Sequence, residues 1–160
     1  MRLGIAAVGR LKSGPEKELF DRYCKRISAS GRQKHLFGPD LIQISEARDP
    51  SNQARQTQES QQILAKLPDG AKVILMDERG KDIASQGMAD LLESAQADGT
   101  QALFFCIGGP DGHGDELQKQ ALRSIRFGSV TWPHQLVRIM LAEQLYRAIT
   151  ILSGHPYHRE

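Results

Sequence analysis

The sequence predicts an α/β fold in which a mostly parallel sheet is sandwiched by helices. Short apolar runs of strand length recur along the chain, and each is followed by a segment whose apolar residues repeat at helical spacing. The runs are nearly continuous in apolar residues, which is typical of parallel strands buried on both faces. The 160 residues contain no repeat, low-complexity tract or long linker, so we expect a single domain over residues 1–160.

The first half of the chain alternates strands with helices. We expect strands over residues 3–8, 41–44 and 73–76. We expect helices around residues 19–27, over residues 51–67, and from Ser85 to the residue before Gly99. Gly9 ends the first strand, and the turn sequence Pro68-Asp69-Gly70 ends the second helix.

The second half continues the alternation and contains the most apolar strand. That strand is expected over residues 103–107, before a glycine-rich loop and a helix from about Asp115 to Arg123. A short fifth strand is expected over residues 129–131. Pro133 then opens the longest helix, from about His134 to Leu152. Residues 153–160 have no apolar periodicity, and we expect them to form an extended tail.

The charge is distributed unevenly, although the formal net charge is only +2. Residues 1–36 contain nine Lys or Arg against three acids, a balance of +6 that leaves −4 for the remainder. The region from Leu117 onward is basic again. Two basic regions around an acidic middle are compatible with a polyanionic partner such as RNA, but a charged helix face is also common where it is merely solvated.

Cysteine usage and hydropathy exclude several classes of protein. Cys24 and Cys106 are far apart and form no CxxC motif, which argues against a disulfide scaffold or a cysteine zinc site and fits a reducing, cytoplasmic location. The longest unbroken apolar stretch, Ala102 to Ile107, is too short to span a bilayer, so no membrane partner is expected.

Three strand ends carry the residues that favour ligand binding, because ligands collect at the carboxyl ends of parallel strands. These are Met76-Asp77, the Gly-Gly-Pro-Asp-Gly-His-Gly loop at 108–114, and the segment 127–134. The loop matches neither the dinucleotide-binding nor the P-loop pattern, and a plain glycine-rich turn remains the alternative. We expect His113 and His134 to form local hydrogen bonds, not to act in catalysis.

The C-terminal tail concentrates reactive side chains. His155, Tyr157, His158 and Arg159 lie within five positions of one another, and Pro156 stiffens the segment. Histidine and tyrosine exchange protons, and arginine binds phosphate or an anionic oxygen. A frayed terminus is the alternative. Zinc ligation by His155 and His158 is disfavoured, since a closed site needs further ligands and no cysteine is near.

Several of these motifs together resemble one family. They are Ile-Gly-Gly-Pro-Asp-Gly at 107–112, Thr-x-Pro-His at 131–134, Leu-Val-Arg at 136–138, Glu-Gln-Leu-Tyr-Arg-Ala at 143–148 and His-Pro-Tyr-His-Arg-Glu at 155–160. The chain is similar over its whole length to the ribosomal RNA large subunit methyltransferase H family. These SPOUT-class bacterial enzymes methylate N3 of a pseudouridine in 23S rRNA.

The resemblance implies a fold, a cofactor and a partner. The C-terminal half is expected to form a deep trefoil knot whose loops bind S-adenosylmethionine. The protein is expected to be a homodimer with its active site at the subunit interface, acting on 23S rRNA in the ribosome and not on DNA. The cofactor-binding residues carried over by position are Met76, Gly108, Phe127, Gly128, Ser129, Val130, Thr131 and Trp132.

The catalytic hypothesis assigns roles to the tail and the last helix. His158 assists removal of the N3 proton, Tyr157 positions the base, and Arg159 and Arg147 hold phosphate or the developing anion. A non-catalytic, ribosome-associated RNA-binding factor of the same fold is the alternative. A flavodoxin-like enzyme that binds a nucleotide at the glycine loop is a second one.

Overall fold

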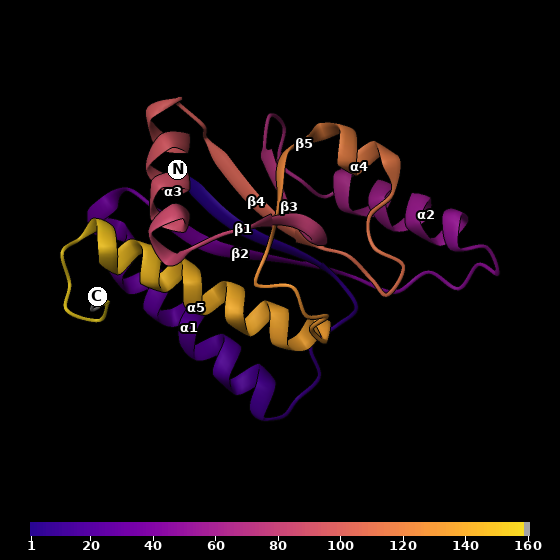
Figure 1. Ribbon diagram of the computed structural model, residues 1–160, viewed down its shortest axis with the longest axis horizontal. Helices are drawn as coiled ribbons and strands as arrows, with labels where there is room; N and C mark the ends of the chain where they lie inside the picture. Colours follow the sequence, from indigo (N-terminus) through magenta and orange to yellow (C-terminus); the bar gives the residue numbers. More distant parts are fainter. Residues whose placement is uncertain (159–160) are drawn as a thin grey trace.

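Five parallel strands form the centre of the molecule, in the order β2–β1–β4–β3–β5 (Figure 1). The structure is a computed structural model that describes residues 1–158. The strands are β1 (Arg2–Val8), β2 (Phe37–Ile44), β3 (Lys72–Asp82), β4 (Ala102–Ile107) and β5 (Ala121–Arg126). The helices are α1 (Pro15–Gly31), α2 (Asn52–Leu64), α3 (Ser85–Ala97), α4 (Asp115–Gln120) and α5 (His134–Leu152), with a 3₁₀ turn over Arg32–Lys34. The predicted α/β class is confirmed, and the trefoil knot stays a prediction.

Helices cover both faces of the sheet. Figure 1 shows α1, α3 and α5 on one face and α2 with α4 on the other. The central strands β1 and β4 are buried along almost their whole length, which explains why both read as continuous apolar runs. Within residues 1–158, no helix has the length and hydrophobicity needed to cross a membrane.

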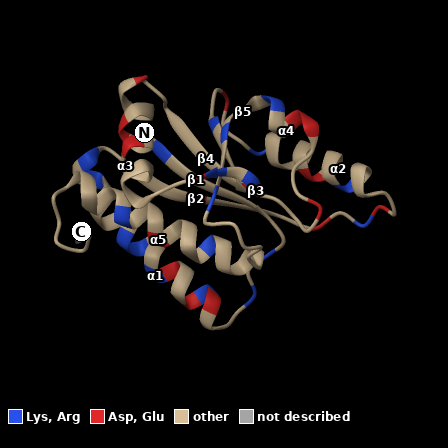
Figure 2. Ribbon diagram, viewed as in Figure 1, with Lys and Arg blue, Asp and Glu red and all other residues tan. Residues whose placement is uncertain are grey.

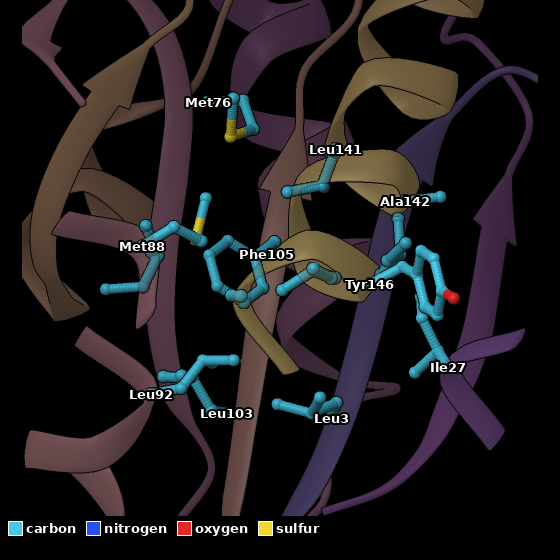
Figure 3. Close-up of a cluster of buried hydrophobic side chains, with 14 of the residues drawn as sticks. Leu3, Ile27, Met76, Met88, Leu92, Leu103, Phe105, Leu141, Ala142 and Tyr146 are labelled. Atoms are coloured by element: carbon cyan, nitrogen blue, oxygen red, sulfur yellow. The ribbon is translucent and has the colours of Figure 1, made fainter. Parts of the chain in front are cut away.

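The larger core lies between the sheet and α1, α3 and α5. Alternate residues of β4 point to opposite faces, so Leu103 and Phe105 enter this core, whereas Phe104 and Cys106 enter the core beneath α2 and α4. Figure 3 shows the Phe105 ring surrounded by side chains from the sheet and from the helices of this layer. Burying one such side chain stabilises the fold by about 1.5–3 kcal/mol.

The predicted strand over residues 129–131 is wrong, and so is the predicted extension of the preceding helix to Arg123. Helix α4 ends at Gln120, and β5 begins at once and pairs with β3. Of the six residues of β5 only Ile125 is buried, because β5 is the edge strand, so its apolar pattern is too weak to detect. Residues 127–133 form a loop in which Val130 is exposed.

We predict that Phe105→Ala lowers the free energy of unfolding by about 3–5 kcal/mol, because it leaves a cavity in the larger core. Urea unfolding followed by circular dichroism measures the change. Leu122→Ala is the control, since this side chain is 56% exposed and its removal should cost about 0.5 kcal/mol or less. Equal losses in the two variants would contradict the packing described.

Candidate active site

A cavity of about 680 Å³ opens at the carboxyl ends of β3, β4 and β5. Its walls are the three segments that the sequence singles out: the end of β3, the glycine loop, and the loop between β5 and α5. The predicted cofactor residues that line it are Met76, Gly108, Phe127, Gly128, Val130, Thr131 and Trp132. Ser129 is not among the lining residues, so the structure brings together all of the predicted set except Ser129.

The glycine loop folds back on its own backbone. Gly109 and Gly112 form an isolated antiparallel bridge, and the Gly112 amide donates to the Gly109 carbonyl oxygen at 3.0 Å. A Cβ at Gly108 would lie 2.9 Å from the Gly112 oxygen, and Gly112 itself has φ +83°. Only glycine fits both positions, and the close fold leaves the backbone accessible to a ligand in the cavity.

His113 fixes the glycine loop to β3. The ring is buried, and its Nε2 lies 3.0 Å from the Met76 carbonyl oxygen. Because a carbonyl can only accept, Nε2 carries the proton and donates it. Burial lowers the pKa of His113, which favours this neutral form. The structure confirms that His113 makes a local hydrogen bond.

The third wall is held by contacts between β3 and the loop that follows β5. β3 bulges outward at residues 77–80, and Gly80 lies so close to the β5 backbone that a Cβ would come within 2.7 Å of the Ile125 nitrogen. The Thr131 hydroxyl donates to Glu78 at 3.2 Å, and the Trp132 indole N–H donates to the Phe127 carbonyl oxygen at 2.8 Å. These bonds give the loop a defined shape without regular secondary structure.

The predicted catalytic residues of α5 and the tail gather around Glu143. Arg147 donates to Glu143 Oε1 through Nε at 2.9 Å and through Nη2, and the Tyr157 hydroxyl donates to the same oxygen at 3.1 Å. The Arg147 guanidinium carbon also lies 4.8 Å from the centre of the Tyr157 ring. Burial raises the pKa of Tyr157, and the charge of Glu143 adds to this effect.

His158 lies at the edge of this cluster. Its Nδ1 lies 3.5 Å from Arg147 Nη1. Arginine can only donate, so this contact requires Nδ1 without a proton and places the proton of the neutral ring on Nε2. Arg159, the fourth predicted catalytic residue, lies outside the described residues.

The predicted extended tail is wrong. The chain turns at Gly154, which has φ +66°, and Tyr157 packs edge-on against Tyr146 with 4.7 Å between ring centres. The turn returns the tail to α5 because a buried aromatic contact is available there. Glu143 is the residue that sequence reasoning missed. Its place four positions before Arg147 on a helix was the available signal.

The cavity and the cluster around Glu143 lie at opposite ends of α5. His134 and Val137 line the cavity, whereas Arg147 is 13 positions beyond His134, about 20 Å away at the rise of an α-helix. Figure 1 shows the C-terminal segment at the end of α5 that is remote from the β5–α5 loop. The two halves of the predicted site are therefore not brought together within one chain.

Comparison with known proteins decides the family. A family model described as "Predicted SPOUT methyltransferase" matches residues 1–158. The chain belongs to the SPOUT methyltransferase family. It is 48% identical over 159 residues to a ribosomal RNA large subunit methyltransferase H of Mesorhizobium japonicum and 46% identical to one of Brucella anthropi, and each match covers 99% of both chains. A relative of the same name from Chelativorans is 48% identical over 160 residues, all of this chain and 92% of its own length.

Membership in the SPOUT methyltransferase family makes this protein an enzyme and fits the chemistry of its cavity. Methyl transfer needs a donor and an acceptor that is oriented in line with it. Within residues 1–158, no three His, Cys, Asp or Glu side chains gather where a metal ion would be held. The cavity combines an apolar wall from Met76, Ile107 and Val137 with the accessible backbone of the glycine loop.

We predict that His113 makes this methyltransferase less stable in mild acid. Its pKa is lowered in the folded state, so below about pH 6.5 the unfolded chain binds a proton that the folded chain does not. The contribution of neutral His113 to the free energy of unfolding is thus fully present above that pH and is lost as the pH falls. His113→Gln keeps a donor for the Met76 oxygen without titrating, and should lose less stability between pH 7.5 and 5.5 in urea unfolding. The matched control is His155→Gln, at an exposed position; a pH dependence equal to wild type in His113→Gln would contradict the assignment.

Proposed function

We propose that this protein transfers a methyl group from S-adenosylmethionine to N3 of a pseudouridine in 23S rRNA. It acts on the assembled ribosome in the cytoplasm, as a homodimer whose subunits are single domains over residues 1–160. The relatives named ribosomal RNA large subunit methyltransferase H support the substrate class. The observation that carries the proposal is the cavity at the ends of β3, β4 and β5.

The cavity suits the proposed donor in size and chemistry. Its volume of about 680 Å³ lies within the range of small-molecule sites. Met76, Ile107 and Val137 offer an apolar wall for an adenine ring, and the glycine loop offers backbone N–H and C=O groups to the polar parts. When bound, the donor supplies an electrophilic methyl group on a sulfonium. The intact cavity argues against the alternative of a non-catalytic factor of the same fold.

The acceptor atom determines what the side chains do. N3 of pseudouridine carries a proton and is a poor nucleophile until that proton leaves. His158 accepts it at Nδ1, once that atom leaves its 3.5 Å contact with Arg147, because both Glu143 oxygens already accept hydrogen bonds from neighbouring side chains. Arg147 and Arg159 stabilise the anion that remains. Tyr157, fixed by Glu143 and the Arg147 guanidinium, positions His158. Each such group contributes about 10²–10⁴-fold to the rate.

The separation along α5 supports a shared active site. Arg147 lies about 20 Å along α5 from His134 at the cavity, so the cluster of Arg147, Tyr157 and His158 acts on a donor held in the cavity of another chain. A two-fold dimer then contains two equivalent sites, each with a cavity from one subunit and a tail from the other.

Mixing two inactive variants tests the proposed activity and the shared site together. Gly108→Ala removes donor binding, because a Cβ there meets the Gly112 oxygen, and His158→Ala lowers kcat by about 10²–10⁴-fold. After subunits exchange in an equal mixture, each mixed dimer has one complete site, so about a quarter of the wild-type activity should return. The measurement is transfer of a radiolabelled methyl group to ribosomes from a strain that lacks the modification.

The double variant Gly108→Ala with His158→Ala, mixed with wild type, is the control for subunit exchange. If each site combines two chains, both sites of a mixed dimer carry one lesion and the mixed dimer is inactive. If each site lies within one chain, one site carries both lesions and the other site is intact. No recovery in the first mixture, with exchange demonstrated by a tag, would disprove the shared site. A wild-type protein that labels no ribosomes would disprove the proposed activity.

The basic face of α1 is the proposed contact with the rRNA backbone. Figure 2 shows Lys and Arg along this helix, and Arg22, Lys25 and Arg26 are exposed. None of the three has an ion-pair partner within residues 1–158. Arg10 and Lys12 extend the same charge beyond the start of α1. Unpaired surface cations release counterions when they meet phosphates, which favours binding.

We predict that Lys25→Gln weakens ribosome binding and flattens its salt dependence. Loss of one phosphate contact should lower the slope of log K against log salt by about 0.7–0.9. Binding measured between 50 and 200 mM salt gives the slope. Lys66→Gln, in the turn after α2 on the other face of the sheet, is the control and should leave the slope unchanged. An unchanged slope for Lys25→Gln would remove α1 from the RNA surface.

A further inference from the structure

Helix α2 forms hydrogen bonds with Asp111, at the centre of the glycine loop. Arg55 donates to both carboxylate oxygens of Asp111, through Nε at 2.7 Å and Nη2 at 3.0 Å. Gln56, the next residue of α2, donates from its side-chain amide to the Asp111 backbone oxygen at 2.5 Å. Both the side chain and the main chain of Asp111 are therefore held by neighbouring residues of one helix.

The ends of the loop also rest on α2. The Ser60 hydroxyl accepts from the buried Gly114 amide at 2.8 Å. A Cβ at Gly114 would lie 2.6 Å from the Gln56 carbonyl oxygen, and a Cβ at Gly109 would lie 2.9 Å from a carboxylate oxygen of the buried Glu59. Because the loop follows the surface of α2 this closely, its shape depends on that helix.

The Arg55 guanidinium is itself fixed in place. It donates to the carbonyl oxygen of Asp49 at 2.7 Å and to the side-chain oxygen of Asn52 at 2.5 Å. The Arg55 and Asp111 side chains are only 23% and 17% exposed. A bidentate, partly buried pair whose arginine is already oriented keeps more of its strength than an exposed pair.

The bonds from Arg55 also determine which way the Asp111 carboxylate is directed. Asp111 borders the cavity, where a free carboxylate would face a cationic donor directly. Both of its carboxylate oxygens instead accept from Arg55, on the side of α2. Asp111 is thus, together with Gly114, a point at which α2 holds the loop.

We infer that Arg55 is a positioning residue for methyl-donor binding, because it holds the glycine loop, through Asp111, in the conformation that binds the donor. The inference rests on the proposed use of the cavity for S-adenosylmethionine. Arg55 does not line the cavity, although its neighbour Gln56 on α2 does. Loss of the pair lowers the fraction of molecules in the binding conformation, and the apparent Kd rises in inverse proportion to that fraction.

The test measures donor affinity in a double-mutant cycle. Titration calorimetry with S-adenosylhomocysteine should show a Kd about tenfold higher for Arg55→Gln and for Asp111→Asn, if the competent fraction falls to about a tenth. The double variant should bind no worse than either single variant, since both remove the same bond. In the methylation assay the KM for the donor should rise while kcat at saturating donor is kept. Arg55→Lys should recover part of the affinity.

The Arg2–Asp40 pair at the opposite ends of the strands is the matched control. Arg2 donates to Asp40 through Nε at 3.0 Å and through Nη2, and Arg2→Gln should change the Kd less than twofold. Wild-type affinity in Arg55→Gln, or independent effects of Arg55→Gln and Asp111→Asn, would overturn the inference. Failure of the wild-type protein to bind the ligand would instead overturn the proposed function. Amide exchange at Gly112 and Gly114 then still reports whether Arg55→Gln loosens the loop, and unchanged exchange there would overturn the anchoring as well.

Discussion

The immobility of α5 sets the geometry of the whole site. Leu141, Leu145 and Ile149 are fully buried against the sheet and its neighbouring helices. Near the start of the helix, the buried Arg138 donates through Nη2 to the carbonyl oxygens of Val8 and Gly9, at 2.5 and 2.8 Å. Shifting α5 would break these bonds and expose side chains worth about 1.5–3 kcal/mol each. The distance along α5 between the cavity and the Glu143–Arg147 pair is therefore fixed by this packing, which is the reason that the proposed active site takes its cavity and its C-terminal cluster from two chains.

The cavity itself depends on backbone packing more than on side chains. The glycine loop gains its narrow shape from residues without a Cβ, which also have the largest conformational entropy to lose on folding. Bonds from outside the loop offset this cost: His113 ties it to β3, and Ser60 with the Arg55–Asp111 pair ties it to α2. The conformation of this glycine-rich loop is thus determined by its neighbours, so the residues that shape the cavity extend well beyond those that line it.

Local pattern was sufficient for the parts of the fold that bury long apolar runs. The runs at residues 3–8, 73–76 and 103–107 all lie in strands, and α5 has the bounds expected from its apolar stripe. The edge strand β5 was missed because pairing with β3, a contact distant in sequence, determines it while only Ile125 is buried. For the same reason the sequence did not indicate the turn of the tail, whose cause is the contact between Tyr157 and Tyr146.

The candidate site shows the same limit. The positions carried over from the family agree with the lining of the cavity except at Ser129, since a lining residue needs only the correct loop. The roles of Glu143 and Arg55 were not predicted, because each depends on a partner placed by tertiary structure: Tyr157 for Glu143 and Asp111 for Arg55. A motif identifies the loop that borders a ligand, whereas the contacts that hold that loop are visible only once the fold is known.

The two parts of the cluster around Glu143 differ in how firmly they are held. Glu143 and Arg147 belong to the fixed helix α5 and bond to each other there. Tyr157 and His158 are held by an edge-on aromatic pair worth about 0.5–1.5 kcal/mol, by the Arg147 guanidinium over the Tyr157 ring, by one hydroxyl bond and by a long contact with Arg147. These contacts bury far less than the packing of α5 does, so under the proposed function a bound RNA with a few kcal/mol of differential affinity shifts the Tyr157–His158 segment. A fixed Glu143–Arg147 pair next to an adjustable Tyr157–His158 segment suits the proposed reaction, in which the site closes over a base of the rRNA.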